Sequence, residues 1–427
     1  MSYQKNMSNN WPTKKLGEVT KIEGGGTPST KNPLFWNGDV LWLTPKELSD
    51  FSGREIFDTE RKITSEGLKH SKLFPAGAVL FTSRAPIGYV AIAGIQMATN
   101  QGFKNFICNE KVLNNGFLYY FLKLKTKYLQ SLGRGATFTE ISRSILAKVD
   151  IPLPPLEIQK QIVERLDKIV AAQKLNDDLI QKADELFQSL LHKELNSAGP
   201  AYTPTKQHTN KLEYVGMSGS RSKTPADASA FVKTSEDKKA MAGKKDWEVK
   251  KLGDIAEIIM GQSPPSSTYN ERGEGLPFFQ GKAEFGEIYP TPLKYCPKPT
   301  RIAEAGDILM SVRAPVGNIN LAKERSGIGR GLGAIRAREG IDQSFLYFFF
   351  IKNENSWSRL SVGSTFLAIR RNNLDNLKVP LPPIKTQKQI VAKLSAAQDY
   401  KTQLLAQKSK LKELFNSVLA KSFNGQA

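Results

Sequence analysis

The 427-residue chain contains few of the residues that build thiol and metal chemistry: two cysteines and three histidines. Cys108 and Cys296 are far apart and no Cys-x-x-Cys occurs, which excludes a zinc ribbon or a disulfide scaffold and predicts a reducing, intracellular environment. His70, His192 and His208 form no cluster with the spacing of metal ligands. The sequence therefore predicts no metal site.

Long apolar runs are also missing. The most apolar segment, Phe345 to Ile351, is far too short to cross a bilayer. The first residues, Met1 to Asn6, lack the apolar stretch of a secretory signal. These absences predict a cytoplasmic protein with no membrane partner.

Acidic residues are outnumbered, with 41 Asp and Glu against 61 Lys and Arg, for a formal net charge of +20. The excess of positive charge is spread along the chain rather than confined to one tail. A protein that is basic throughout is typical of polyanion binders, most often of nucleic acid. Charge alone does not exclude another kind of basic protein.

What the sequence does contain is one long unit written twice. Four pairs of segments establish the repeat: Trp11 to Val19 with Trp247 to Ile255, Arg84-Ala-Pro-Ile-Gly88 with Arg313-Ala-Pro-Val-Gly317, Pro-Leu-Pro-Pro at 152–155 and 380–383, and Gln-Lys-Gln-Ile-Val at 159–163 and 387–391. A collinear repeat of this length indicates two copies of a domain followed by a helix, not a short-period solenoid.

Each copy divides into a Gly-, Pro- and aromatic-rich part with short candidate strands and helices, followed by a long helix. We predict an α/β (α+β) fold with two similar domains, and with helices that pair as an antiparallel coiled coil. The expected boundaries are 11–153 for the first domain, 154–195 for its spacer helix, 196–246 for a flexible polar linker, 247–381 for the second domain and 382–423 for its helix.

The two helices share a heptad seam that no Pro or Gly interrupts, which is typical of a coiled coil. The apolar seam residues are Ile162, Leu166, Ile169, Ile180 and Phe187 in the first copy and Ile390, Leu394, Leu404, Leu411 and Phe415 in the second. The alternative, that each helix packs only on its own domain, is less favoured because the seam is longer than a small domain. Polar seam residues such as Gln173, Asn176, Lys401 and Lys408 are expected to specify register.

Catalytic motifs are weak. Gly329 to Ala334 fits Gly-x-Gly-x-x-Ala, but the next residues indicate a strand, whereas a dinucleotide site needs a helix there. No P-loop occurs. Asn32 to Phe35 resembles the Asn-Pro-Pro-Phe/Tyr loop of amino-methyltransferases without its second proline, and no cofactor unit precedes it. We predict no catalytic residue.

Two arginines are better candidates for binding. Arg84 and Arg313 each follow a candidate strand and precede Ala-Pro-x-Gly, and arginine can donate two hydrogen bonds to a phosphate or to guanine. A structural role in fixing the turn is an equal alternative. The remaining candidate DNA-binding residues are basic groups near aromatic or Gly-rich loops: Lys46, Lys104, Arg134, Arg143, Arg330, Arg370 and Arg371.

The repeat, the Pro-Leu-Pro-Pro entry, the Gln-Lys-Gln-Ile-Val helix start, the loop Gly24 to Thr30 and the segment Trp36 to Lys46 together resemble one family. The chain is similar to the DNA-specificity subunit of type I restriction–modification enzymes. The resemblance implies two target-recognition domains, each reading half of a split double-stranded DNA site, held apart by two antiparallel helices. It implies two methyltransferase subunits docked on the helices and, in the full nuclease, two translocating restriction subunits.

The resemblance also implies that this chain binds no cofactor and that S-adenosylmethionine, ATP and Mg²⁺ belong to its partners. Two other functions remain open from the residues. A stand-alone DNA methyltransferase would need a cofactor motif that the sequence lacks. A coiled-coil scaffold with basic domains would bind DNA without sequence preference.

Overall fold

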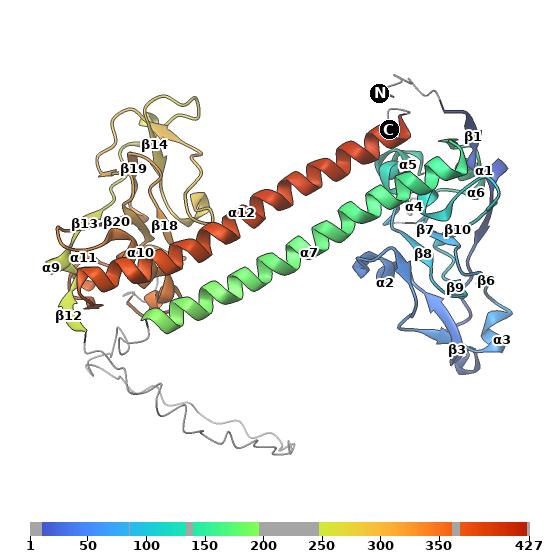
Figure 1. Ribbon diagram of the computed structural model, residues 1–427, viewed down its shortest axis with the longest axis horizontal. Coiled ribbons are helices and arrows are strands. Elements are labelled where there is room, and N and C mark those ends of the chain that lie inside the picture. Colours follow the sequence, from blue (N-terminus) through green and yellow to red (C-terminus); the bar gives the residue numbers. More distant parts are fainter. Residues whose placement is uncertain (1–10, 85, 134–139, 196–246, 361–367, 425–427) are drawn as a thin grey trace, which may run out of the picture. The chain divides into compact units, whose positions relative to one another are not determined.

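The computed structural model describes residues 11–84, 86–133, 140–195, 247–360 and 368–424. The predicted linker at 196–246 and the candidate Arg134 lie outside these residues. The chain forms two compact units, one made of Met1–Leu179 with Leu404–Ala427 and the other of Ile180–Gln403. Each unit contains one domain and a part of both long helices (Figure 1).

The first domain is built on two mixed sheets, with strand orders β2-β10-β7-β8-β4 and β5-β3-β9-β6, and on the small pair β1-β11. Most neighbours are antiparallel, while β3 with β9 and β4 with β8 are parallel. The strands are β1 (Thr13–Lys15), β2 (Thr20–Gly24), β3 (Trp36–Leu43), β4 (Glu55–Ile56), β5 (Lys62–Ile63), β6 (Leu73–Phe74), β7 (Val79–Thr82), β8 (Val90–Ala93), β9 (Met97–Thr99), β10 (Phe103–Cys108) and β11 (Asp150–Pro152).

Short helices surround these sheets. They are α1 (Leu16–Val19), the 3-10 turn η1 (Pro33–Phe35), α2 (Pro45–Asp50), α3 (Ser65–Leu68), α4 (Asn115–Leu124), α5 (Thr126–Leu132) and α6 (Arg143–Ala147). All residues of β7 and β8 are buried, because α4 covers one face and the second sheet covers the other. This double cover explains why these strands are apolar runs rather than alternating ones.

The second domain repeats this plan. Its sheets have the orders β13-β20-β17-β18 and β15-β14-β19-β16, with the pair β12-β21. The strands are β12 (Glu248–Lys251), β13 (Ala256–Met260), β14 (Leu276–Phe279), β15 (Tyr295–Cys296), β16 (Ile302–Ala303), β17 (Ile308–Ser311), β18 (Ile319–Leu321), β19 (Ser326–Ile328), β20 (Leu332–Ala337) and β21 (Lys378–Leu381). Its short helices are α9 (Leu252–Ile255), η3 (Ser266–Thr268), η4 (Lys282–Glu284), α10 (Gln343–Lys352), η5 (Glu354–Leu360) and α11 (Arg371–Asp375).

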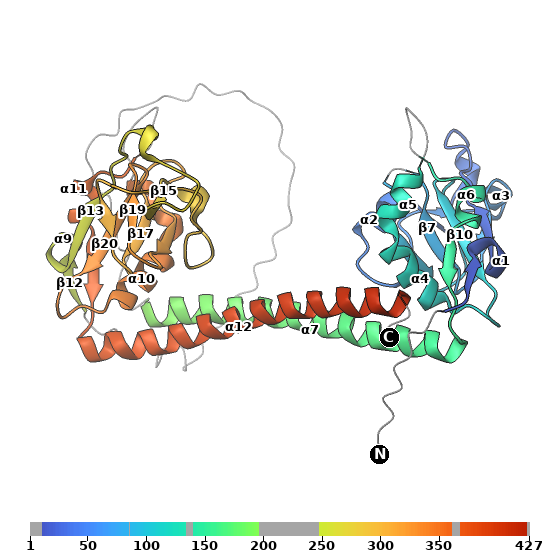
Figure 2. The same ribbon diagram turned by 90° about the horizontal axis from the view of Figure 1, so that it is seen from above.

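Two helices of 40 residues each, α7 (Leu156–Leu195) and α12 (Ile384–Phe423), begin directly after the Pro-Pro pairs. Proline suits such a start because the N–H groups of the first turn have no partner within the helix. Figures 1 and 2 show α7 and α12 side by side in each unit. Their contacts run antiparallel, as predicted: Asp184 and Glu194 of α7 pair with Lys401 and Lys393 of α12.

The seam residues contact both the other long helix and a domain core. Ile162 and Leu166 lie in the core of the first domain, while Phe187, Ile390 and Leu394 lie in the core of the second. The C-terminal end of α12 lies beside α4 (Figure 2). There Phe423 packs on Phe117 of α4 with ring centroids 4.6 Å apart. All ten predicted seam residues are buried or half-buried. The helices therefore pair with one another and also form part of each domain core.

A buried glutamine joins each domain to its own helix. Gln159 of α7 accepts a hydrogen bond from the backbone N–H of Asn114 at 2.8 Å, and Gln387 of α12 accepts one from Asp342 at 2.9 Å. Asn114 and Asp342 are the N-caps of α4 and α10. The repeated Gln-Lys-Gln-Ile-Val segment thus fixes the position of the same domain helix in both copies.

Candidate nucleic-acid interface

Arg84 lies at the end of β7, beside the turn Asn100 to Gly102. The buried Ser83 donates its backbone N–H to the Gly102 carbonyl at 2.8 Å, and Ile141 donates to the Ser83 carbonyl at 2.9 Å. Backbone pairing therefore holds Arg84 between this turn and the segment that begins at Glu140, and the Arg84 side chain is 45% exposed. The predicted placement at a strand end is confirmed.

Lys46 approaches the same turn from another strand. It is an exposed residue in α2, which follows β3. The Asn100 N–H donates to the Leu43 carbonyl at 2.9 Å, and a Cβ at Gly102 would lie 3.2 Å from Pro45 and 3.9 Å from Arg84. The fold thus brings Lys46 and Arg84 to one edge of the domain.

The Gly-Gly-Thr-Pro loop completes this edge. A Cβ at Gly25 would come within 2.2 Å of the Thr99 carbonyl, so only glycine permits this approach. Thr27 then donates to Gln101 and accepts from Asn100. In the second domain a Cβ at Gly261 would lie 2.1 Å from the Gly329 carbonyl, so the close approach is repeated although the following residues differ.

Arg313 occupies the matching position in the second domain. Val312 donates its N–H to the Gly331 carbonyl at 2.8 Å, and Ile369 donates to the Val312 carbonyl at 2.9 Å. Arg330 lies in the adjacent turn, where its own N–H donates to Ser263 at 3.1 Å. Both arginines are exposed. The backbone hydrogen bonds on either side of Arg84 are therefore repeated around Arg313.

One basic residue was missed by the sequence prediction. The parallel pairs Trp42–Ala98 and Phe278–Gly327 are equivalent, which makes Lys282 the counterpart of Lys46. Lys282 is exposed and opens η4. A lysine four residues after the strand aromatic in both copies is the signal that could have identified it.

The other candidate DNA-binding residues differ in whether their side chains are free to contact a ligand. Arg143 and Arg370 are exposed. Arg143 is the first residue of α6, and Arg370 is the N-cap of α11. Arg371 instead pairs with Asp375 at 3.5 Å. Lys104 is 14% exposed at its side chain and donates to Glu140 at 2.8 Å. Lys104 is therefore a counter-ion within the domain rather than a free cation.

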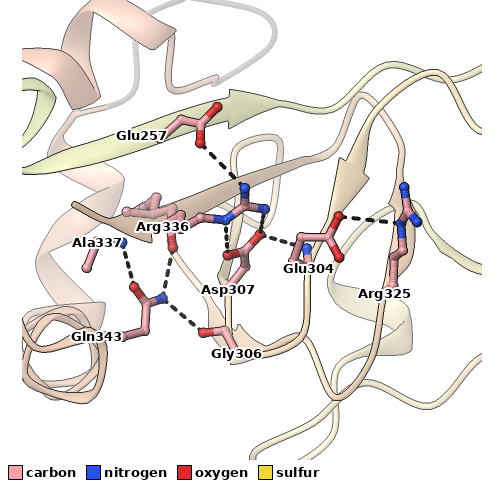
Figure 3. Close-up of polar contacts among 9 residues, drawn as sticks. Glu257, Glu304, Gly306, Asp307, Arg325, Arg336, Ala337 and Gln343 are labelled. Atoms are coloured by element: carbon pink, nitrogen blue, oxygen red, sulfur yellow. Dashed lines mark hydrogen bonds and ion pairs between the residues drawn. The ribbon is translucent and has the colours of Figure 1, made fainter. Parts of the chain in front are cut away.

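The basic strand after Gly329 is similarly neutralised (Figure 3). Arg336 of β20 forms two hydrogen bonds to Asp307, at 2.9 and 2.7 Å, and approaches Glu257 at 3.5 Å. The Asp307 side chain is 3% exposed. Hydrogen bonding to Asp307, opposed by partial desolvation, raises the pKa of Arg336. This pair of a half-exposed arginine with a buried carboxylate stabilises the sheet locally and engages Arg336 within the domain.

In the first domain a cavity lies where the second has the Arg336–Asp307 pair. Register makes Ala78 the counterpart of Asp307 and Ile107 that of Arg336. Here a cavity of about 370 Å³ is lined by Ala78, Ile107, Cys108 and Lys160 among others. Burial, with a smaller contribution from Glu110, raises the pKa of the Cys108 thiol to about 12. Cys108 is therefore a neutral thiol at physiological pH, not a nucleophile.

The weak catalytic motifs have structural explanations. Gly329 to Gly331 is a turn that leads into strand β20, so it lacks the helix that a dinucleotide site needs. Asn32 caps the 3-10 turn η1, where its side chain accepts from the Leu34 N–H at 3.1 Å. Within the described ranges, no group of His, Cys, Asp and Glu side chains is arranged to hold a metal, and no helix is long and apolar enough to span a membrane.

Comparison with known proteins identifies close relatives of this architecture. The family described as type I restriction modification DNA specificity domain matches residues 8–185 and 244–413. The putative type I restriction enzyme MjaX specificity subunit of Methanocaldococcus jannaschii is 36% identical, over 97% of this chain and 92% of that protein.

Solved structures show the same fold. The crystal structure of the HsdS subunit from Thermoanaerobacter tengcongensis is similar, with a TM-score of 0.52 and 28% identity over 98% of this chain and 97% of that one. The S subunit of a type I restriction–modification system from M. genitalium has a TM-score of 0.59 at 16% identity, covering 99% and 98% of the two chains, and shares the fold.

Proposed function

Because the chain belongs to the type I restriction–modification DNA specificity family, we propose that each of its two domains reads one half of a split double-stranded DNA site. The observation that carries this proposal is the duplicated edge formed by Arg84 with Lys46 and by Arg313 with Lys282. Exposed basic side chains at a strand end can contact phosphates or base edges. The loops around them differ between the copies, which supports two different half-sites.

Apolar side chains on the long helices support a docking role for the same chain. In the first unit Val170, Leu175 and Leu414 are exposed, and in the second Leu186, Tyr400 and Ile384 are exposed. A contiguous exposed apolar patch marks a protein interface, and we propose that these residues contribute to such a patch in each unit. Methyltransferase subunits are the partners that the proposed function requires at these positions.

The complex we propose contains two methyltransferase subunits and, in the full nuclease, two restriction subunits. The chain itself performs no chemistry, and S-adenosylmethionine, ATP and Mg²⁺ are bound by those partners. The complex works in the cytoplasm, where the host DNA is accessible. The neutral thiol of Cys108 is consistent with a protein that does not depend on disulfides.

Methyl transfer tests the proposal directly. The chain is combined with its methyltransferase partner and labelled S-adenosylmethionine, and the methylome of the source organism supplies the substrate sequence. We expect methylation at a split motif only when both proteins are present. Methyl transfer by the isolated chain would instead identify a stand-alone methyltransferase, and equal binding to random and methylome-derived duplexes would identify a non-specific scaffold.

A further inference from the structure

Three charged side chains meet at the recognition edge of the first domain. Arg84 donates from Nε to Glu140 at 2.8 Å, and Lys104 donates from Nζ to the other oxygen of the same carboxylate at 2.8 Å. Lys104 also lies 3.4 Å from the Ser83 hydroxyl. Arg84 and Glu140 are in addition backbone bridge partners. One carboxylate is therefore held from two sides while its own backbone is fixed.

This arrangement orients the guanidinium group. The hydrogen bond to Glu140 uses the Nε edge of Arg84, and neither Nη group bonds to another of the residues that the structure describes. A guanidinium is planar and its donors form a rigid fork, so fixing the Nε edge also fixes the direction of the two Nη groups. Two parallel Nη donors match the O6 and N7 acceptors of guanine in the major groove.

Glu140 stays ionised while it does this. Partial burial raises the pKa of its carboxyl, but hydrogen bonds from Lys104 and Arg84 and their charges together bring that pKa below its ordinary value. Lys104 balances the negative charge, so the group formed by Arg84, Lys104 and Glu140 keeps one net positive charge. The edge thus presents an oriented cation rather than a neutral pair.

The second domain keeps the backbone and lacks the carboxylate. Arg313 is bridged to Ala368, as Arg84 is to Glu140. Lys104 pairs with Phe81 of β7 and Gly333 with Met310 of β17, so glycine replaces the lysine. Among the described residues, Arg313 forms no side-chain ion pair. The two edges therefore share these backbone bridges and differ in the carboxylate and the lysine.

We propose that Glu140 is a positioning residue that aims Arg84 at a guanine in the half-site read by the first domain. The inference rests on the proposed function and deepens it. Arg313, without such a partner, contacts the DNA backbone as a mobile cation. The two domains thus use the same arginine position for different purposes, base reading in the first and phosphate contact in the second.

The test uses the complete complex with its methyltransferase partner and duplexes in which each base pair of the methylated motif is changed in turn. Arg84→Ala first identifies the base pair at which discrimination depends on Arg84. Glu140→Gln keeps the size of the side chain and removes its charge. We expect Glu140→Gln to reduce discrimination at that same base pair by about tenfold and to leave every other position unchanged.

Two controls make the result specific. Glu18→Gln removes another carboxylate of the first domain, which is 52% exposed against 31% for Glu140 and lies 3.9 Å from Lys14, and it should leave discrimination unchanged. Ala368→Glu supplies Arg313 with a carboxylate and should make the salt dependence of binding shallower by about one counterion. This second variant tests the proposal even if no substitution at position 140 yields a folded protein.

Three outcomes would overturn the inference. If the Glu140→Gln complex binds every duplex more tightly and to the same extent, Glu140 only reduces the positive charge of this edge. A lower melting temperature with unchanged discrimination would make it a structural residue. An Ala368→Glu variant with an unchanged salt slope would mean that Arg313 does not contact phosphate. A wild-type complex with no base preference at all would instead refute the proposed function itself.

Discussion

At the scale of single residues, matching backbone hydrogen bonds carry different side chains in the two copies. Arg84 and Arg313 follow equivalent strands and bridge to equivalent residues, Glu140 and Ala368. Among the residues that the structure describes, Arg84 has a carboxylate partner and Arg313 has none. A structural role and a binding role were equal alternatives from the sequence. The exposed positions of both side chains favour contact with a ligand over the fixing of a turn.

Substitution of the two arginines should have different effects, relaxing the first half-site for Arg84 and weakening binding overall for Arg313. If the side chain contacts a base with two hydrogen bonds, Arg84→Ala costs roughly 1–3 kcal/mol of discrimination, confined to the first half-site. Arg313→Ala removes a proposed phosphate contact, so it should weaken binding to every duplex about equally and leave discrimination unchanged. Competition binding with singly substituted duplexes measures both effects. If Arg84→Ala lowers the melting temperature while DNA discrimination stays intact, Arg84 is a structural residue instead.

The thiol of Cys108 should be unreactive in the folded protein. Its pKa is raised to about 12, chiefly by burial, so the thiol stays protonated up to strongly alkaline pH and the reactive thiolate is scarce at pH 8. In a Cys296→Ser variant, iodoacetamide should label Cys108 slowly at pH 8 and rapidly after denaturation. Mass spectrometry measures the labelled fraction. Fast labelling of the native variant would contradict the assigned environment.

At the scale of elements, the long helices contain both a buried seam and exposed apolar residues. Asn176 of α7 donates its side-chain amide to the Leu404 carbonyl of α12 at 3.0 Å. The two residues occupy the same seam position in the two copies. Gln173 likewise donates to the Leu411 carbonyl at 3.2 Å. Polar groups of this kind favour one register over its alternatives, as expected from the sequence.

Two leucines on α7, one buried and one exposed, distinguish an effect on folding stability from an effect on partner binding. Leu166 is fully buried, so Leu166→Ala should cost about 2–5 kcal/mol of unfolding free energy through lost packing and a residual cavity. Leu175 is 61% exposed, so Leu175→Ala should change stability by less than about 0.5 kcal/mol.

The proposed docking role adds a second readout to this pair. Leu175→Ala should weaken co-purification with the methyltransferase partner, although its denaturation midpoint is unchanged. Chemical denaturation and pull-down with tagged methyltransferase measure the two properties. A Leu175→Ala protein that retains its partner at full affinity would remove this residue from the docking surface.

At the scale of the whole molecule, the distributed charge of +20 should dominate the affinity for DNA. Each neutralised phosphate releases counterions, so the logarithm of the binding constant should fall linearly with the logarithm of salt concentration. Titration of a fluorescent duplex at several ionic strengths measures the slope. A flat response between low and physiological salt would show that electrostatic contacts do not carry the affinity.

The two helices should also set the distance between half-sites. Each residue of helix adds about 1.5 Å, so insertion of one heptad into both helices near Asn176 and Leu404 lengthens them by about 10 Å while preserving the seam. At about 3.4 Å per base pair this corresponds to a spacer longer by three base pairs at most. The bases within each half-site should stay the same.

Methylome sequencing of the variant strain measures that spacer. The matched control inserts a heptad into only one helix, which disrupts the pairing and should abolish methylation. An unchanged spacer in a folded, active complex with both insertions would show that other parts of the molecule set the distance.

The sequence by itself determined the duplication, the two long helices, the mixed domains and the basic character of this protein. These features are local or additive: a heptad period, a Pro-Pro helix start and a repeated motif can each be read along the chain without knowledge of its contacts. The family resemblance rested on the same local signals. The structure therefore agrees with the predicted fold class in both units.

Tertiary structure decided which basic residues are available at the candidate interface. Arg84 and Lys104 looked alike as candidates, but Glu140, separated from them by 56 and 36 residues, binds both and leaves Lys104 nearly buried. Lys282 became a counterpart of Lys46 only through the pairing of β14 with β19. Such contacts depend on strand register between distant segments, and side-chain partners over that range are not encoded in any local pattern.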